Sequence, residues 1–313
     1  MARAFIFPGQ GSQAVGMGQA LAAALPAARL VFEEVDDALG QNLSRLIFAG
    51  PESELILTEN AQPALMATSL AVVRSLESEG GFRLADKAAF VAGHSLGEYS
   101  ALAAVGAVTI GDAARLLRRR GQAMQRAVPV GEGAMAALLG LELDVAQSVT
   151  AAAAEGEVVA CANDNAPGQV VISGHRGAVE RAIALAKERG GKRAMLLPVS
   201  APFHCALMQP AADVMAEALT QVVLAPPHLP LIANVTAAAV SDPETIRRLL
   251  VEQVTAIVRW RESVLTLKAQ GVDTLVELGA GKVLTGLAKR IEREMTALSA
   301  LTPAEVEAVL RLL

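Results

Sequence analysis

A serine between two glycines is the residue best placed to act as a nucleophile. Residues 93–97 read Gly-His-Ser-Leu-Gly, which matches the pattern G-x-S-x-G around Ser95. The apolar run 88–92 precedes the motif, and residues 98–104 have the composition of a helix. A sharp turn from strand to helix lifts a serine hydroxyl out of a sheet, and glycines let the backbone pass closely. We predict that Ser95 is the nucleophile; a serine that only caps the helix is the alternative.

A serine nucleophile needs a base, and the chain has 4 histidines. His94 adjoins the nucleophile and is expected to point elsewhere. His175 is expected in a glycine-rich turn, and His228 lies among prolines, at the expected surface. His204 follows Ser95 along the chain, which is the order found in α/β-hydrolases. His204 is therefore the predicted base.

No acidic residue stands out as the group that orients the predicted base. Asp112, Asp144 and Asp164 precede or fall within an expected inserted domain, and none has a persuasive context. A backbone carbonyl or an amide could hold the imidazole instead. The sequence leaves this position open.

A glycine-rich loop at 9–13 follows the first apolar run. It lacks the Lys-Ser/Thr pair of a P-loop and the third glycine of a dinucleotide-binding fingerprint. Ligands bind at the carboxyl ends of strands in parallel α/β folds, so the loop and the Ser95 turn are expected to lie together. A backbone N–H of the loop could then complete an oxyanion hole.

Three consecutive arginines occupy 118–120, in a helix expected to begin near Gly111. For Arg118 and Arg119 the default explanation is a position near the helix C-terminus, where cations interact with the macrodipole. One arginine that turns inward could hold a substrate carboxylate through two hydrogen bonds. The pattern does not decide which arginine does so.

The order of apolar runs predicts an α/β fold. Strands are expected at 4–7, 88–92, 230–234 and 274–278, with helices between them and after the last one. Such alternation is typical of a mainly parallel sheet. Between them, the order β-α-β-β-α-β is typical of a ferredoxin-like unit, with a turn-rich loop at 163–168. We predict a body of residues 1–130 and 199–313 with an inserted domain at 131–198; one continuous sheet is the alternative.

The composition excludes several classes of protein. Of 313 residues, 53% are hydrophobic and 19% charged, the opposite of the balance in a disordered chain. A net charge of −5, with 7 Phe, 1 Trp and 1 Tyr, argues against nucleic-acid binding. Apolar stretches are short or rich in proline, so neither a signal peptide nor a membrane helix is expected. The 2 cysteines favour a reducing, cytoplasmic compartment, and no metal-ligand spacing is present.

Several motifs together resemble those of malonyl-CoA:acyl carrier protein transacylases. They are collinear over essentially the whole chain: Phe7–Gln13, Gly93–Tyr99, Arg120–Gly121 with Met124 and Gln125, Ala162–Asn163 with Asn165, Phe203–His204, Asn234–Val235, Gln253 and Glu277–Gly279. The resemblance implies an α/β-hydrolase-like body with a ferredoxin-like insert. It also implies ping-pong transfer of a malonyl group from malonyl-CoA to an acyl carrier protein, with CoA as product and no cofactor.

The resemblance also assigns roles to individual residues. Ser95 and His204 would be nucleophile and base, with an oxyanion hole of the Gln10 and Leu96 N–H groups. Arg120 would bind the malonyl carboxylate, and a main-chain carbonyl near Gln253 would orient the histidine. The remaining substrate-binding candidates are Gln253, Met124 and Phe203, the last resembling malonyl-selective members.

The expected function is to supply malonyl groups to cytoplasmic fatty-acid synthesis. The alternatives are an acyltransferase of a polyketide pathway, a serine hydrolase or thioesterase, and a non-catalytic binding module. Acyl carrier proteins are acidic, so docking would need a local basic patch, for which Arg118, Arg119 and Arg126 are candidates.

Overall fold

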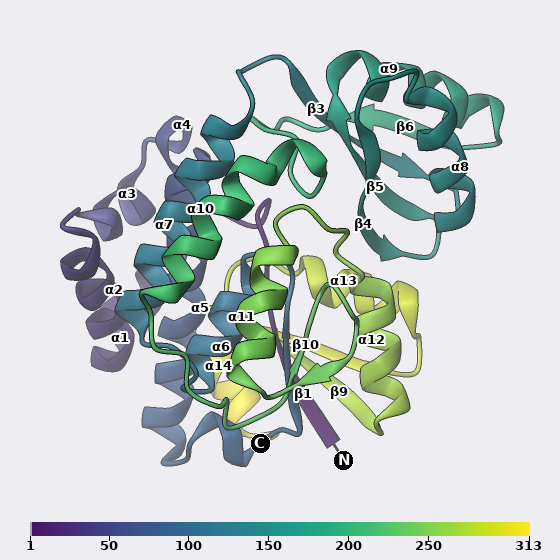
Figure 1. The fold of residues 1–313 in the computed structure, drawn as a ribbon. Coiled ribbons are helices and arrows are strands. Elements are labelled where there is room, and N and C mark those ends of the chain that lie inside the picture. Colours follow the sequence, from purple (N-terminus) through teal and green to yellow (C-terminus); the bar gives the residue numbers. More distant parts are fainter. Residues whose placement is uncertain (1) are drawn as a thin grey trace.

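The computed structural model describes residues 2–313, which form a six-stranded and a four-stranded sheet (Figure 1). The larger sheet has the strand order β10-β9-β1-β2-β7-β8. Its strands are β1 (Ala2–Phe7), β2 (Phe90–Gly93), β7 (Leu231–Ile232), β8 (Ala239–Val240), β9 (Val272–Leu278) and β10 (Thr296–Ala300). All neighbouring pairs are parallel except β7 with β8. The prediction of a parallel-sheet body is confirmed.

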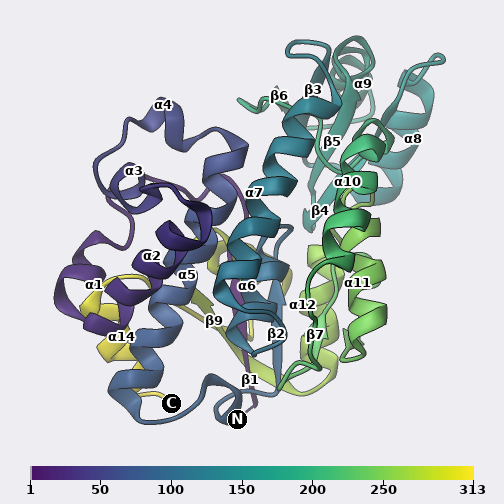
Figure 2. The same ribbon diagram turned by 60° about the vertical axis from the view of Figure 1, so that its left-hand side comes forward.

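Helices cover both faces of this sheet (Figure 2). They are α1 (Gln19–Ala24), α2 (Pro26–Leu39), α3 (Leu43–Ala49), α4 (Glu52–Leu55), α5 (Thr58–Gly80), α6 (Gly97–Ala104), α7 (Ile110–Ala127), α10 (Gln209–Thr220), α11 (Pro243–Glu252), α12 (Trp260–Ala269), α13 (Val283–Ile291) and α14 (Pro303–Leu310). Short 3-10 turns lie at Leu84–Asp86 and Ala206–Met208. Helix α14 begins with the capping box of Thr302 and Glu305 that the sequence indicates.

The alternation of side chains along β1 explains why both faces of the sheet are buried. Phe5 and Phe7 join one apolar cluster with α2, α5 and α7, while Ala4 and Ile6 join another with α12 and α13. Successive side chains of a strand point to opposite faces, so a central parallel strand is apolar throughout. The parallel pairing of β1 with β2, in which Phe7 lies opposite Gly93, places the carboxyl ends of the two strands side by side.

The smaller sheet lies above one end of the body (Figure 1, upper right). It consists of β3 (Gly133–Leu139), β4 (Val159–Ala166), β5 (Gln169–His175) and β6 (Arg193–Leu196), with α8 (Leu143–Ala153) and α9 (Arg176–Glu188) packed against it. The strand order is β4-β5-β3-β6 and every pair is antiparallel. This is the β-α-β-β-α-β unit that the sequence pattern predicts.

Two local predictions are wrong. The segment 163–168 is not a loop, because β4 continues to Ala166 and leaves only Pro167 and Gly168 to turn. The pairing of β4 with β5 shifts register between Cys161 and Asn163 and between Asp164 and Ala166, and Asn163 also forms a parallel bridge to Val258 of the body. The end of the chain is not all helical either, since β10 pairs with β9 at the sheet edge.

No helix within residues 2–313 combines the length and the apolar character needed to cross a membrane.

Candidate active site

The Ser95 turn has a geometry that depends on its two glycines. Strand β2 ends at Gly93 and α6 begins at Gly97, with Ser95 between them at φ 54°. A Cβ atom on Gly93 would lie 1.9 Å from the Gly97 carbonyl carbon, and one on Gly97 would lie 2.3 Å from the Phe7 carbonyl oxygen. Only glycine fits both positions, because real Cβ contacts are never so close. The left-handed serine is strained, as expected at a functional turn.

A buried asparagine holds this turn in place. Asn234 lies shortly after β7 in the chain, and its Oδ1 accepts a hydrogen bond from the Ser95 backbone N–H at 2.7 Å. Its Nδ2 donates to the Gly93 carbonyl at 2.7 Å. The two bonds tie the turn to the neighbouring strand and satisfy polar groups that burial would otherwise leave unpaired.

The imidazole of His204 contacts the serine hydroxyl. Its Nε2 lies 2.8 Å from Ser95 Oγ, and its Nδ1 lies 2.9 Å from the Gln253 carbonyl oxygen. The carbonyl can only accept, so it places the proton on Nδ1 and leaves Nε2 as an acceptor for the hydroxyl. Burial, together with the charge of Arg120, lowers the pKa of His204 to about 3. The imidazole is therefore neutral near pH 7.

Within residues 2–313 no other histidine reaches Ser95. His94 Nε2 lies 2.9 Å from Asn165 Oδ1, and His175 Nδ1 accepts from the Val158 N–H. His228 is exposed.

None of the three aspartates considered contacts His204 in the described part of the chain. Asp112 bonds to Thr109 and Arg115, and Asp144 lies in the first turn of α8. Asp164 pairs with Arg261 at 2.9 Å. The orienting group that the sequence left open is a main-chain carbonyl.

The backbone amides of Gln10 and Leu96 lie in segments that follow adjacent strands. Phe7 of β1 pairs with Gly93 of β2, so the loop carrying Gln10 and the turn carrying Leu96 leave the same sheet edge. Within residues 2–313 the N–H groups of Gln10 and Leu96 donate to no other protein group. Unpaired amides such as these, one in a loop and one at the N-cap of α6, are suited to bind an oxyanion.

Arg120 is a buried cation beside the nucleophile. Arg120 lies on the inner face of α7, and only 1% of its surface is exposed. Its Nη1 donates to Gln62 Oε1 at 2.8 Å, and its Nη2 donates to Gln253 Oε1 at 2.8 Å and to Ser95 Oγ at 3.2 Å. These acceptors are all uncharged, and no carboxylate accepts a hydrogen bond from Arg120 within residues 2–313. A substrate carboxylate would be the first charged group to bond to this guanidinium directly.

The other two arginines of the triplet lie outside the site. Helix α7 continues to Ala127, so the macrodipole explanation for Arg118 and Arg119 is wrong: both sit in mid-helix. Arg118 donates to the amide oxygens of Gln41 and Asn60. Arg119 pairs with Glu217 at 3.5 Å on the surface.

A cleft of about 610 Å³ opens above these groups, between the body and the small sheet. Ser95, His204 and Arg120 line its floor, together with Met124 and Phe203. Residues of β3, β4 and β5 line the opposite wall. All eight residues selected from the sequence thus lie at or beside one cleft: Gln10, Ser95, Leu96, Arg120, Met124, Phe203 and His204 line it, and Gln253 adjoins it.

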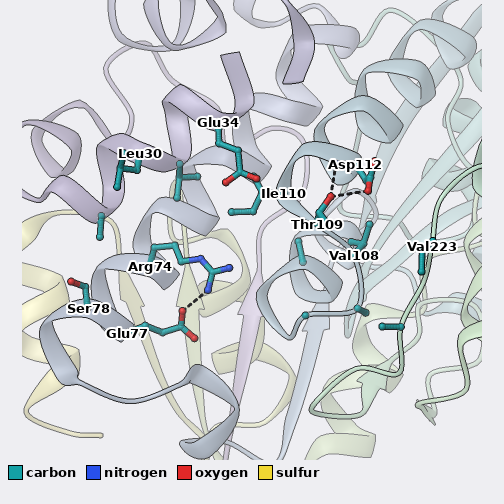
Figure 3. Close-up of a pocket in the computed structure, with 16 residues that line it drawn as sticks. Leu30, Glu34, Arg74, Glu77, Ser78, Val108, Thr109, Ile110, Asp112 and Val223 are labelled. Atoms are coloured by element: carbon teal, nitrogen blue, oxygen red, sulfur yellow. Dashed lines mark hydrogen bonds and ion pairs between the residues drawn. The ribbon is translucent and has the colours of Figure 1, made fainter. Parts of the chain in front are cut away.

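A larger hollow of about 870 Å³ lies elsewhere, between α2, α5 and the start of α7 (Figure 3). Of the charged side chains that line it, Arg74 bonds to Glu77 at 2.6 Å and Asp112 bonds to Thr109 at 2.8 Å, while Glu34 also lines it. It contains no serine and histidine in contact. The cleft at Ser95 is therefore the candidate active site despite its smaller volume.

Comparisons with known proteins agree with this geometry. Residues 4–307 match the acyl transferase domain family. The malonyl CoA-acyl carrier protein transacylase of Escherichia coli K12 is 48% identical over 309 residues, which cover 99% of each chain. The chain belongs to the malonyl CoA-acyl carrier protein transacylase family. The resemblance drawn from the sequence is confirmed.

Solved structures of transacylases share the whole architecture. An acyl-carrier-protein S-malonyltransferase from Bartonella henselae is 57% identical, with a TM-score of 0.98 over 100% of this chain and 99% of that one. A malonyl-transacylase solved with a type II polyketide synthase acyl carrier protein is 43% identical, with a TM-score of 0.97 and full coverage of both chains.

Three buried polar residues complete the transacylase site without having been selected for a role from the sequence: Gln62, Glu98 and Asn234. Gln62 and Glu98 lie inside helices whose surroundings are apolar. Only their tertiary contacts separate them from ordinary helix residues, although Glu98 and Asn234 do fall within the family motifs.

Proposed function

We propose that this protein transfers a malonyl group from malonyl-CoA to the phosphopantetheine thiol of an acyl carrier protein. The observation that carries the proposal is the Ser95–His204 contact of 2.8 Å beside a buried arginine without a carboxylate partner. The pair provides nucleophile and base, and Arg120 provides a reason to choose a substrate that ends in a carboxylate.

In the first half-reaction Ser95 Oγ attacks the thioester carbonyl while His204 Nε2 takes its proton. The N–H groups of Gln10 and Leu96 bind the oxyanion of the tetrahedral intermediate. Its collapse breaks the carbon–sulfur bond, and the imidazolium returns the proton to the departing sulfur. The products are malonyl-Ser95 and CoA.

The second half-reaction repeats these steps with the carrier. His204 takes the proton of the phosphopantetheine thiol as its sulfur attacks the Ser95 ester. Collapse of the intermediate releases Ser95 Oγ, which recovers the proton from the imidazolium. Malonyl-carrier leaves and the free enzyme is restored.

Arg120 explains the choice of donor. A malonyl carboxylate can accept two hydrogen bonds from the guanidinium, whereas an acetyl group leaves a buried charge unpaired. Met124 and Phe203 are proposed to line the acyl pocket, and the Gln253 side chain is proposed to fix the arginine from the far side, at 2.8 Å.

We further propose that the reaction uses no cofactor, because this chain supplies every group that the chemistry requires. A cytoplasmic location and a role in fatty-acid synthesis belong to the same proposal; Cys161 and Cys205 are free thiols, as suits a reducing compartment. The polyketide alternative is retained because one close structural relative was solved with a polyketide synthase carrier.

The test is incubation with malonyl-CoA followed by mass spectrometry, with Ser95→Ala as control. We expect a malonyl adduct on Ser95 alone, and its discharge by purified carrier faster than by water. Discharge by water that outpaces the carrier would identify a hydrolase or thioesterase instead. Absence of an adduct would favour a binding module, and relative rates with fatty-acid and polyketide carriers would identify the pathway.

A further inference from the structure

Glu98 is a buried carboxyl group next to the active site that the proposed mechanism does not use. It lies in the first turn of α6, three residues after the nucleophile, and only 1% of it is exposed. Its Oε1 accepts a hydrogen bond from the Asn234 backbone N–H at 2.5 Å, and its Oε2 accepts one from Gln253 Nε2. Burying a charged group is costly, so this one needs an explanation.

The two partners of Glu98 hold the two halves of the reacting pair. Asn234 accepts from the Ser95 N–H at 2.7 Å. Gln253 presents its carbonyl to His204 Nδ1 at 2.9 Å and donates from Nε2 to the Ser95 carbonyl at 2.9 Å. Glu98 thus links Asn234, which holds the nucleophile Ser95, to Gln253, which holds the imidazole of His204.

The direction of these hydrogen bonds requires a carboxylate. The Asn234 backbone N–H can only donate. The Gln253 amide cannot turn around, because its Oε1 accepts from Arg120 at 2.8 Å. Both oxygens of Glu98 are therefore acceptors, and a protonated Glu98 would direct an O–H toward a donor.

We propose that the Glu98 carboxylate is a positioning residue for acyl transfer, which holds Asn234 and Gln253 so that Ser95 and His204 keep their reacting geometry. This inference rests on the proposed function. It predicts that loss of the negative charge slows the chemical step while the affinity for malonyl-CoA changes little.

The charge of Glu98 is poised to respond to pH. Burial raises the pKa of Glu98 to about 8, against the opposing effects of its two N–H donors and of Arg120 on α7. Of the other titratable groups around it, burial raises the pKa of Tyr99 to about 12, and burial lowers that of His204 to about 3. Glu98 is thus the group of this network that titrates near pH 8. The carboxylate that these hydrogen bonds require predominates above that pH, so the rate should rise with pH there.

The experiment measures kcat and KM for malonyl transfer between about pH 6 and 9 in the wild type and in Glu98→Gln. The matched control is Glu277→Gln, because Glu277 is also buried, its pKa is also raised by burial, and it bonds to Leu284 and Thr285 instead of the site. We expect Glu98→Gln to lower kcat about ten- to a hundredfold, to change KM by less than about threefold and to lose the rise near pH 8. The control should keep the rise.

A second variant and a measurement without substitution keep the inference testable if Glu98→Gln does not fold. Glu98→Asp retains the charge and should keep a pH-dependent rise at reduced kcat. In the wild type, the NMR signal of the His204 Nδ1 proton should shift with a midpoint near pH 8.

An unchanged kcat and pH profile in Glu98→Gln, or a signal that stays constant between about pH 6 and 9, would overturn the inference. Failure of the proposed function is distinct, because it removes the malonyl adduct on Ser95 from the wild type itself.

Discussion

Replacement of Arg120 by alanine tests how the site selects a carboxylate. A charge-assisted hydrogen bond contributes roughly 1.5–3 kcal/mol, so two bonds to the malonyl carboxylate contribute about 3–6 kcal/mol. At about 1.4 kcal/mol per tenfold, kcat/KM for malonyl-CoA should fall about 10²- to 10⁴-fold. Acetyl-CoA has no carboxylate to lose. With that donor the variant loses only the contacts that both donors share, which are the 3.2 Å contact from Nη2 to Ser95 Oγ and the bonds to Gln62 and Gln253, so kcat/KM should fall at least about tenfold less than with malonyl-CoA.

The same substitution has a cost for stability that can be measured separately. Gln62 Oε1 and Gln253 Oε1 each lose a donor, at about 1–3 kcal/mol apiece, partly offset because a buried charge is removed. Thermal unfolding reports this part, and transfer kinetics with malonyl-CoA and acetyl-CoA report the selectivity.

The matched control is Arg119→Ala, one position earlier on α7. Its guanidinium pairs with Glu217 at the surface, where an ion pair contributes about 0–1 kcal/mol. Both donors should load Ser95 at the wild-type rate, because this half-reaction does not involve the carrier for which Arg119 is a candidate docking residue. If Arg120→Ala lowers kcat/KM equally for malonyl-CoA and acetyl-CoA, the arginine does not select the carboxylate and the reasoning fails.

Three further outcomes follow from the site geometry. Gly97→Ala should abolish the Ser95 adduct seen by mass spectrometry, since its Cβ would meet the Phe7 carbonyl at 2.3 Å, whereas Gly286→Ala, with open space around it, should retain the adduct. Asn234→Ala should lower kcat about tenfold or more and also lower Tm, because the Ser95 N–H and the Gly93 carbonyl lose their partner; a wild-type kcat would contradict its role. Burial lowers the pKa of His204 to about 3, so between about pH 6.5 and 3 the unfolded chain binds the proton and the folded chain does not. The free energy of unfolding should therefore fall as the pH falls through this window, and chemical denaturation of His204→Gln should show a shallower fall.

Adjacent residues were enough to predict the nucleophile and the type of fold. The G-x-S-x-G turn is a steric solution within five consecutive positions, and its glycines are needed because Gly93 and Gly97 contact backbone directly. The strands of the body are visible as apolar runs because a central parallel strand is buried on both faces. These constraints act between residues that are close together in the sequence, so they can be recognised from short runs of consecutive residues.

Secondary structure was predicted wrongly from the sequence where polar residues bond to partners far away along the chain. Segment 163–168 has the composition of a loop, yet β4 runs through most of it, because Asp164 and Asn165 find partners in Arg261 and His94 of the body. A pattern of polarity cannot distinguish a solvated turn from a strand whose side chains bond across an interface.

The order of the amino acids is sufficient to predict the α/β architecture, the Ser95 turn and a short list of bases that includes His204. The folded chain is needed to show that Arg120 turns inward while its two neighbours do not, that the Gln253 main-chain carbonyl takes the place of an acid, and that Glu98 bonds to residues that hold Ser95 and His204. Those contacts join residues 49 to 155 positions apart. Their energies depend on burial and hydrogen-bond direction, which exist only once the chain has folded.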